Sequence, residues 1–165
     1  MSDTTVTPNV PRAWIWGFPL AFLVHDGEEA LAILRAGELR SLGAPLSVTQ
    51  GLAAIVFELA LFWLAAVLAV WSGRPGWPMR VFGTLLAGYT LHGFVHLAAA
   101  LALPGYVFGA ITALPAVIVY GVLALYRMHA DRMLTRRELA TGVIASALLG
   151  GPFLYVVHAI GKVLG

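Results

Sequence analysis

Apolar residues form five long runs along the chain, separated by short segments rich in glycine, proline and arginine. A helix needs about 20 residues to cross the ~30 Å hydrocarbon core of a bilayer, and each run reaches that length. The runs cover about residues 12–34, 50–71, 80–103, 106–128 and 138–164. The pattern predicts an all-α, polytopic transmembrane helical bundle of about five spans, with residues 1–165 forming a single domain.

The segments between the runs carry the residues that end helices. Residues 72–78 contain two glycines and two prolines, and Pro104-Gly105 predicts a tight turn between the third and fourth spans. Gly150-Gly151-Pro152 predicts a kink or a split in the last span, because proline removes a backbone hydrogen bond. Residues 1–10 are polar and lack a basic cluster, so we expect no signal peptide and a retained first span.

Composition supports a membrane location and excludes several classes of function. The chain is 60% hydrophobic and only 11% charged, whereas soluble domains are about 25% charged. Net charge is +2 and no basic stretch alternates with aromatic residues, so nucleic acid is not an expected partner. The absence of cysteine excludes disulfides, thiolate metal ligands and cysteine nucleophiles.

The basic residues predict an orientation. In a bundle of five spans, the N-terminus and the second and fourth loops share one side, which carries Arg12, Arg74, Arg80, Arg127, Arg132, Arg136 and Arg137. The other side carries Arg35, Arg40 and Lys162. By the positive-inside rule, we expect a cytoplasmic N-terminus in a multi-pass protein of the cell inner (cytoplasmic) membrane.

Histidines and glutamates interrupt the apolar runs at His25, Glu28, Glu29, Glu58, His92, His96 and His158. Such a group at bilayer depth costs about 2.5–3.5 kcal/mol on insertion scales and usually marks function. A rise of about 1.5 Å per residue places those of the first three spans at a similar depth, in the outer half of the membrane. Spacings of three and four residues align them on one face of the first helix and one face of the third.

Nitrogen and oxygen donors without sulfur suit iron, zinc or manganese, so all seven residues are candidate ligands for one or two divalent metal ions. For His158 the alternative is an interfacial residue near Lys162, because the kink leaves its depth undefined. Glu28 and Glu29 are also candidate catalytic bases that would activate metal-bound water. The alternatives are an interfacial cluster in the first helix, hydrogen-bonded neutral histidines in the third, and a protonated structural Glu58.

Three other polar residues lie close in sequence to these candidates or to the motifs around them. Asp26 points about 100° away from His25 on a helical wheel, which favours a supporting or capping role. Tyr89 and Thr112 could hydrogen-bond the site, although packing is the favoured interpretation for each. Gly105 and Gly109 are expected to allow close helix packing.

The motif His25-x-x-Glu28-Glu29 resembles that of the HXXEE family of small bacterial integral membrane proteins. Members tend to carry a later polar-x-x-x-His pair, which His92 and His96 match, and then a Tyr-x-Pro-Gly-x-x-Thr-Ala segment. Residues 106–113 match that segment except that Phe108 replaces the proline. The resemblance covers about residues 20–120 and implies a membrane fold with the polar site at these positions. It implies no reaction, because the family's function is uncharacterised.

The sequence favours a metal-dependent membrane enzyme, an oxidoreductase or a hydrolase, acting on an apolar or lipid-like substrate that enters from the bilayer. One alternative is a proton or divalent-ion transporter. Against it, the cytoplasmic halves of the spans hold few polar residues beyond Thr84 and Thr141. Another alternative is a non-enzymatic membrane subunit whose buried polar network only fixes helix packing.

Overall fold

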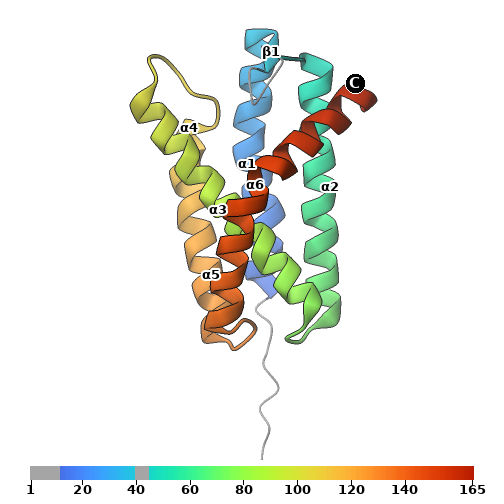
Figure 1. Cartoon of the computed structure of the whole chain (residues 1–165), viewed down its shortest axis with the longest axis vertical. Coiled ribbons are helices and arrows are strands. Elements are labelled where there is room, and N and C mark those ends of the chain that lie inside the picture. Colours follow the sequence, from blue (N-terminus) through green and yellow to red (C-terminus); the bar gives the residue numbers. More distant parts are fainter. Residues whose placement is uncertain (1–11, 40–44) are drawn as a thin grey trace, which may run out of the picture.

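The computed structural model describes residues 12–39 and 45–165, which form a helical bundle (Figure 1). Its long helices are α1 (Arg12–Ala36), α2 (Val48–Ser72), α3 (Trp77–Ala102) and α6 (Arg136–Leu164). Another continuous helical segment consists of α4 (Ala110–Thr112), the π-helix η1 (Ala113–Val119) and α5 (Tyr120–Ala130). Between α1 and α2, β1 (Glu38–Leu39) pairs antiparallel with β2 (Leu46–Ser47). The predicted all-α bundle is confirmed, while residues 1–10 and Arg40 lie outside the described residues.

Local caps explain where the helices begin and end. Ser47 accepts a hydrogen bond from the Gln50 amide at the start of α2, and Gly73 ends that helix with a φ of 58°. Thr135 caps α6 in the same way, together with Glu138. These residues satisfy backbone groups that a helix end would otherwise leave unpaired. The break predicted at residues 72–78 is thereby confirmed.

The turn predicted at Pro104-Gly105 is longer than expected. Helix α3 ends at Ala102 and the next helix begins at Ala110, not at residue 106. The connection over residues 103–109 contains Gly105 and Gly109 with φ of 91° and 76°, a backbone conformation that glycine adopts readily. Gly109 of this connection lies against the side chains of the site described below.

Four helical segments are long and apolar enough to cross a membrane: α2, α3, residues 110–130 and α6. The described chain is therefore a multi-pass membrane protein. Helix α1 is as long as α2, at 25 residues, but its Asp26, Glu28 and Glu29 keep it outside this apolar group. The prediction of about five spans thus corresponds to four apolar helices and one more polar helix packed beside α2.

An aromatic cluster holds the centre of the bundle together. The Phe18 ring lies 4.7 Å from that of Phe62 and 5.5 Å from that of Phe82, measured between centroids. Tyr89 packs beside Phe18 and donates a hydrogen bond to the Ala21 carbonyl at 3.1 Å. Tyr89 therefore ties α3 to α1, which agrees with the packing role favoured for it from the sequence.

Helix α6 packs on α2 and α3 yet buries few side chains, so most of its surface faces outward. Small residues permit the close contacts that it does make. A Cβ at Gly161 would lie 2.5 Å from the Gln50 carbonyl oxygen on α2. The helix is unbroken from Arg136 to Leu164 and changes direction midway (Figure 1), which confirms a kink at residues 150–152 rather than a split.

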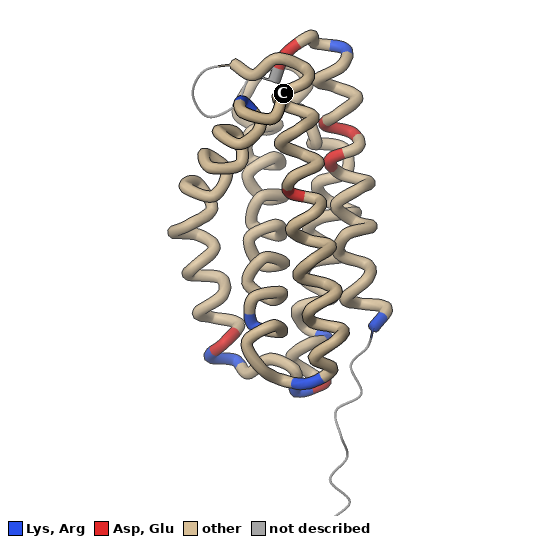
Figure 2. The backbone as a smooth tube through the Cα atoms, turned by 90° about the vertical axis from the view of Figure 1, so that its right-hand side faces the viewer, with Lys and Arg blue, Asp and Glu red and all other residues tan. Residues whose placement is uncertain are grey.

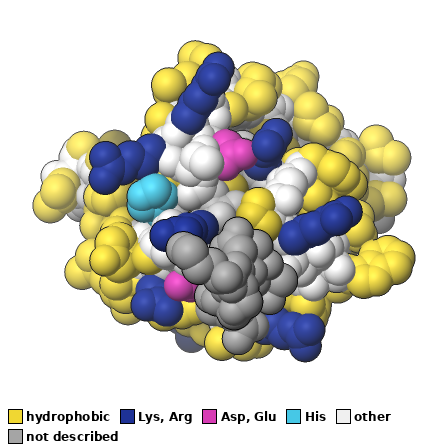
Figure 3. All heavy atoms as spheres, turned by 90° about the horizontal axis from the view of Figure 1, so that it is seen from below, with side chains coloured by type: hydrophobic (Ala, Val, Ile, Leu, Met, Phe, Trp, Pro, Cys, Tyr) yellow, Lys and Arg dark blue, Asp and Glu magenta, His cyan; other side chains and the backbone are white. Residues whose placement is uncertain are grey.

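Charged residues are distributed as a membrane bundle requires. Figure 2 shows Lys and Arg confined to the two ends, whereas acidic residues also occur between the ends, in the upper half of the view. Figure 3 shows many basic side chains gathered on the end that carries the start of α1. At this end Arg80 pairs with Glu138 at 2.5 Å, joining the first turns of α3 and α6. The acidic residues away from the ends therefore need a separate explanation.

Candidate metal centre

Four ionisable side chains converge between α1 and α3. His25 and Glu29 of α1 and His92 and His96 of α3 each offer one potential ligand atom, and these atoms lie within 4.8 Å of one another. His96 Nε2 is 2.7 Å from His92 Nε2 and 3.1 Å from Glu29 Oε1. His25 Nε2 lies 3.9 Å from the same Glu29 oxygen. We call these four residues the His/Glu group; each helix supplies its pair at a spacing of four residues.

A hydrogen-bond chain fixes how His25 presents its ring. Thr112 donates its hydroxyl proton to Glu28 Oε2 at 2.7 Å, so its oxygen accepts from His25 Nδ1–H at 2.9 Å. His25 Nε2 is then unprotonated, and this fully buried atom has no hydrogen-bond partner. Metal-binding histidines are held in this manner, with one nitrogen donating to a protein group and the other free for the metal.

The chemistry of the His/Glu group fits a cation. The free nitrogen of His25 and the Glu29 carboxylate both present lone pairs to the centre. His92 and His96 approach through their Nε2 atoms, so at most one of these two atoms carries the proton shared between them. The buried His25 nitrogen has no donor, which is costly. A metal ion at the centre would accept lone pairs from all four residues once the proton shared by His92 and His96 is released.

Gly109 closes the group on the side of the connecting segment. A Cβ at this position would lie 2.7 Å from His25 Cε1, 2.9 Å from Glu29 Oε1 and 3.1 Å from His96 Cε1. Because real Cβ atoms do not approach so closely, only glycine fits without displacing the group. Sequence reasoning assigned Gly109 to helix packing and missed this contact.

Glu28 faces the connecting segment instead of the His/Glu group. Its carboxylate accepts hydrogen bonds from the Tyr106 hydroxyl, from the Thr112 hydroxyl, and from the amides of Ile111 and Thr112 at 3.2 and 2.8 Å. It thereby caps the helical segment that begins at Ala110. Partial burial and the bond to Glu28 raise the pKa of Tyr106 to about 12, so its hydroxyl remains a donor. These contacts give Glu28 a positioning role toward His25.

The structure does not bring Glu58 or His158 into the group either. Glu58 of α2 lines an adjacent cavity, and His158 lies on α6, one turn before Lys162. Asp26 lines the same cavity and is only 4% exposed, with Oδ2 lacking a hydrogen-bond partner. The sequence placed Glu58 at the depth of the group, but depth alone does not reveal whether its side chain reaches the group.

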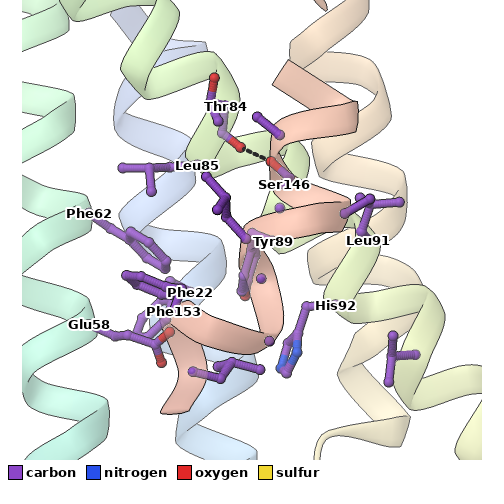
Figure 4. A pocket seen from close by; sticks show the side chains of 18 of the residues that line it. Phe22, Glu58, Phe62, Thr84, Leu85, Tyr89, Leu91, His92, Ser146 and Phe153 are labelled. Atoms are coloured by element: carbon purple, nitrogen blue, oxygen red, sulfur yellow. Dashed lines mark hydrogen bonds between the residues drawn. The ribbon is translucent and has the colours of Figure 1, made fainter. Parts of the chain in front are cut away.

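The cavity has a volume of about 470 Å³ and is bounded by α1, α2, α3 and α6 (Figure 4). Phenylalanine, leucine and small residues form most of its wall, and Asp26, Glu58 and His92 supply carboxyl and imidazole groups. His92 belongs to both the cavity and the His/Glu group. A molecule in the cavity would therefore lie next to the candidate metal centre.

The motif order and this geometry agree with a comparison against known families. The family described as protein of unknown function with HXXEE motif matches residues 16–124. The chain belongs to the HXXEE family. Comparisons with curated proteins and with solved structures give no match.

The matched region of the HXXEE family contains the whole His/Glu group together with Glu28, Gly109 and Thr112. Within the motif, His25 and Glu29 face the centre, whereas Glu28 holds the segment that orients His25. The three named residues of the motif thus have two different roles: His25 and Glu29 offer ligand atoms, and Glu28 positions His25. Helix α6, which forms one wall of the cavity, lies beyond the match.

Removing the Thr112 hydroxyl should weaken metal binding without unfolding the bundle. In Thr112→Val, His25 Nδ1 loses its acceptor, and we expect about 10–100-fold weaker metal affinity, as for other residues that orient metal ligands. Thr112→Ser keeps the hydroxyl and should bind as the wild type does. Competition with a chelator of known affinity measures the difference, and equal affinity in all three proteins would refute the orienting role.

Proposed function

We propose that the chain is a membrane-embedded, metal-dependent enzyme that binds one divalent ion through His25, Glu29, His92 and His96. The observation that carries the proposal is the convergence of four potential ligand atoms within 4.8 Å, including a buried His25 nitrogen without a hydrogen-bond partner. A structural polar network would pair the His25 nitrogen with a donor, because an unpaired buried acceptor is costly. A single set of four ligands supports one ion in preference to two.

Three nitrogens and one oxygen suit iron, zinc or manganese. When bound, such an ion supplies Lewis acidity and, if it is iron, electron transfer. The surrounding residues bind and orient it: Thr112 and Glu28 hold the His25 ring, and Gly109 brings the connecting segment directly over the group. The cavity beside His92, lined mainly by apolar residues, favours an apolar or lipid-like substrate.

Conversion of a membrane lipid tests the enzymatic proposal. Purified protein in vesicles of total lipid extract is incubated with oxygen and a chemical reductant, and the lipids are compared by mass spectrometry. We expect one lipid class to be consumed by metal-loaded wild type and not by Glu29→Gln or by chelator-treated protein. Lipids unchanged by fully loaded wild-type protein would contradict enzyme action on the membrane.

We further propose that the arginine-rich end faces the cytoplasm and that the protein resides in the cell inner membrane. The basic side chains on that end support this orientation (Figure 3). Because the chain has no cysteine, single cysteines report sidedness directly. We expect a membrane-impermeant thiol reagent to label Leu103→Cys on intact spheroplasts and Arg132→Cys only after permeabilisation. The reverse pattern would show the opposite orientation.

A further inference from the structure

The cavity between α1, α2, α3 and α6 has the properties of a ligand site. Its volume of about 470 Å³ falls within the range of about 300–1,000 Å³ that is usual for small-molecule pockets. Phe22, Phe62 and Phe153 provide aromatic wall, and α6 contributes mainly small residues and leucines. Such a lining fits hydrocarbon.

Only a few polar groups that line the cavity are available to bond a ligand. Ser146 donates its hydroxyl to the Thr84 carbonyl at 2.7 Å, so this pair is already satisfied. Asp26 Oδ2, by contrast, is buried without a hydrogen-bond partner. Figure 4 shows Glu58 and His92 toward the end of the cavity opposite Thr84. The carboxyl oxygens of Asp26 and Glu58 can accept hydrogen bonds from a ligand, and Asp26 Oδ2 has no other partner.

We propose that this cavity binds one hydrocarbon chain of an amphiphile whose head carries hydrogen-bond donors, a hydroxyl or an amine. The head contacts Asp26 and Glu58, and the chain lies against the phenylalanines and α6. This assignment rests on the proposed function, since it names the substrate class of the same site. It places the donor-bearing carbon next to His92, and hence next to the His/Glu group. An acidic head is disfavoured there, because a carboxylate would bury a charge beside two carboxyl groups that offer it no opposite charge.

The wall formed by α6 explains how a membrane molecule reaches the cavity. Gly150 and Gly151 line the cavity, and a Cβ at either position would find no atom within 4 Å. The neighbouring Leu148 is 72% exposed on the outer surface of the same helix. The wall that α6 forms is therefore thin at the two glycines, because the opposite surface of the same helix faces lipid. A membrane molecule can enter the cavity at this point.

Photo-labelling in phosphatidylcholine nanodiscs tests the proposal. The probes are a long-chain alcohol, an amine and a carboxylic acid, each with the same diazirine in its chain, and labelled residues are mapped by mass spectrometry. We expect the alcohol and the amine to label residues that line the cavity about tenfold more than the acid does. Equal labelling by all three probes would overturn the head-group assignment.

Two sets of variants complete the test. Gly150→Phe adds a ring at a position that lines the cavity and should abolish its labelling, whereas Leu148→Phe, on the exposed surface of the same helix, should not. Asp26→Asn/Glu58→Gln should remove the discrimination against the acid. Labelling that persists in Gly150→Phe would overturn the proposal.

Metal content measured on the same samples separates this inference from the proposed function. Gly150→Phe should keep its metal while losing the label, which supports a cavity distinct from the ligand set. Cavity labelling of a wild-type protein that binds no metal would support the lipid site and contradict the metalloenzyme. Stoichiometric metal without cavity labelling would overturn the lipid site alone.

Discussion

Replacing His92 and His96 together by alanine is expected to abolish stoichiometric metal binding. The two Nε2 atoms lie 2.7 Å apart and provide half of the His/Glu group. With them removed, only His25 and Glu29 remain, and two protein ligands do not form the closed or nearly closed sites that hold zinc or iron tightly. Elemental analysis by inductively coupled plasma mass spectrometry measures the loss, with an expected fall from about one equivalent per chain to near zero.

The matched control is His158→Ala, which removes a histidine from a helix that contributes nothing to the group. We expect this variant to keep its metal. Size-exclusion chromatography in detergent and a thermal unfolding curve verify that both variants remain folded. If the double variant is folded and retains wild-type metal content, the ligand assignment is incorrect.

The second large effect is expected at Gly109. In Gly109→Ala the new methyl group would stand 2.7 Å from His25 Cε1 and 2.9 Å from Glu29 Oε1, so the group or the segment must move. We predict at least about tenfold weaker metal affinity, since displaced ligands lose their common centre. Chelator competition measures this affinity, and the lipid conversion described above should fall in parallel.

Gly105→Ala is the control for backbone strain. Gly105 has a φ of 91°, and a Cβ there would meet no atom within 4 Å. Both variants therefore pay the cost of a left-handed alanine, about 1–2 kcal/mol, but only Gly109→Ala intrudes on the group. Equal metal affinity in the two variants would mean that strain, and not contact with the ligands, limits binding at this segment.

Much of the fold could be predicted from apolar run length and from glycine and proline positions, because these act locally. The start of the fourth long helical segment, at Ala110, could not be predicted in this way. It depends on Glu28, which lies 83 residues before Ile111 in the chain and accepts its amide hydrogen bond. A cap supplied from so far away leaves no trace in the local pattern, so the helix was expected four residues too early.

The site could be predicted in part for a related reason. Spacing of four residues correctly paired His25 with Glu29 and His92 with His96, because helix geometry alone determines these faces. Spacing did not separate Glu28 from Glu29, since both lie on the face of His25. The two glutamates differ because amides and hydroxyls of residues 106–112 donate hydrogen bonds to the Glu28 carboxylate. These bonds turn Glu28 away from the His/Glu group. Asp26 was assigned a supporting role, and the sequence did not reveal that it lines a cavity whose other walls come from α2, α3 and α6.

The metal content of the purified wild-type protein tests the central claim most directly. The measurement is elemental analysis after reconstitution with iron, zinc or manganese in turn and removal of loosely bound ions. The account predicts one tightly bound equivalent per chain of one of these metals, and the element would then distinguish redox from hydrolytic chemistry. No stoichiometric metal under any of these conditions would contradict the account and leave the His/Glu group as a site of proton transfer or of helix packing.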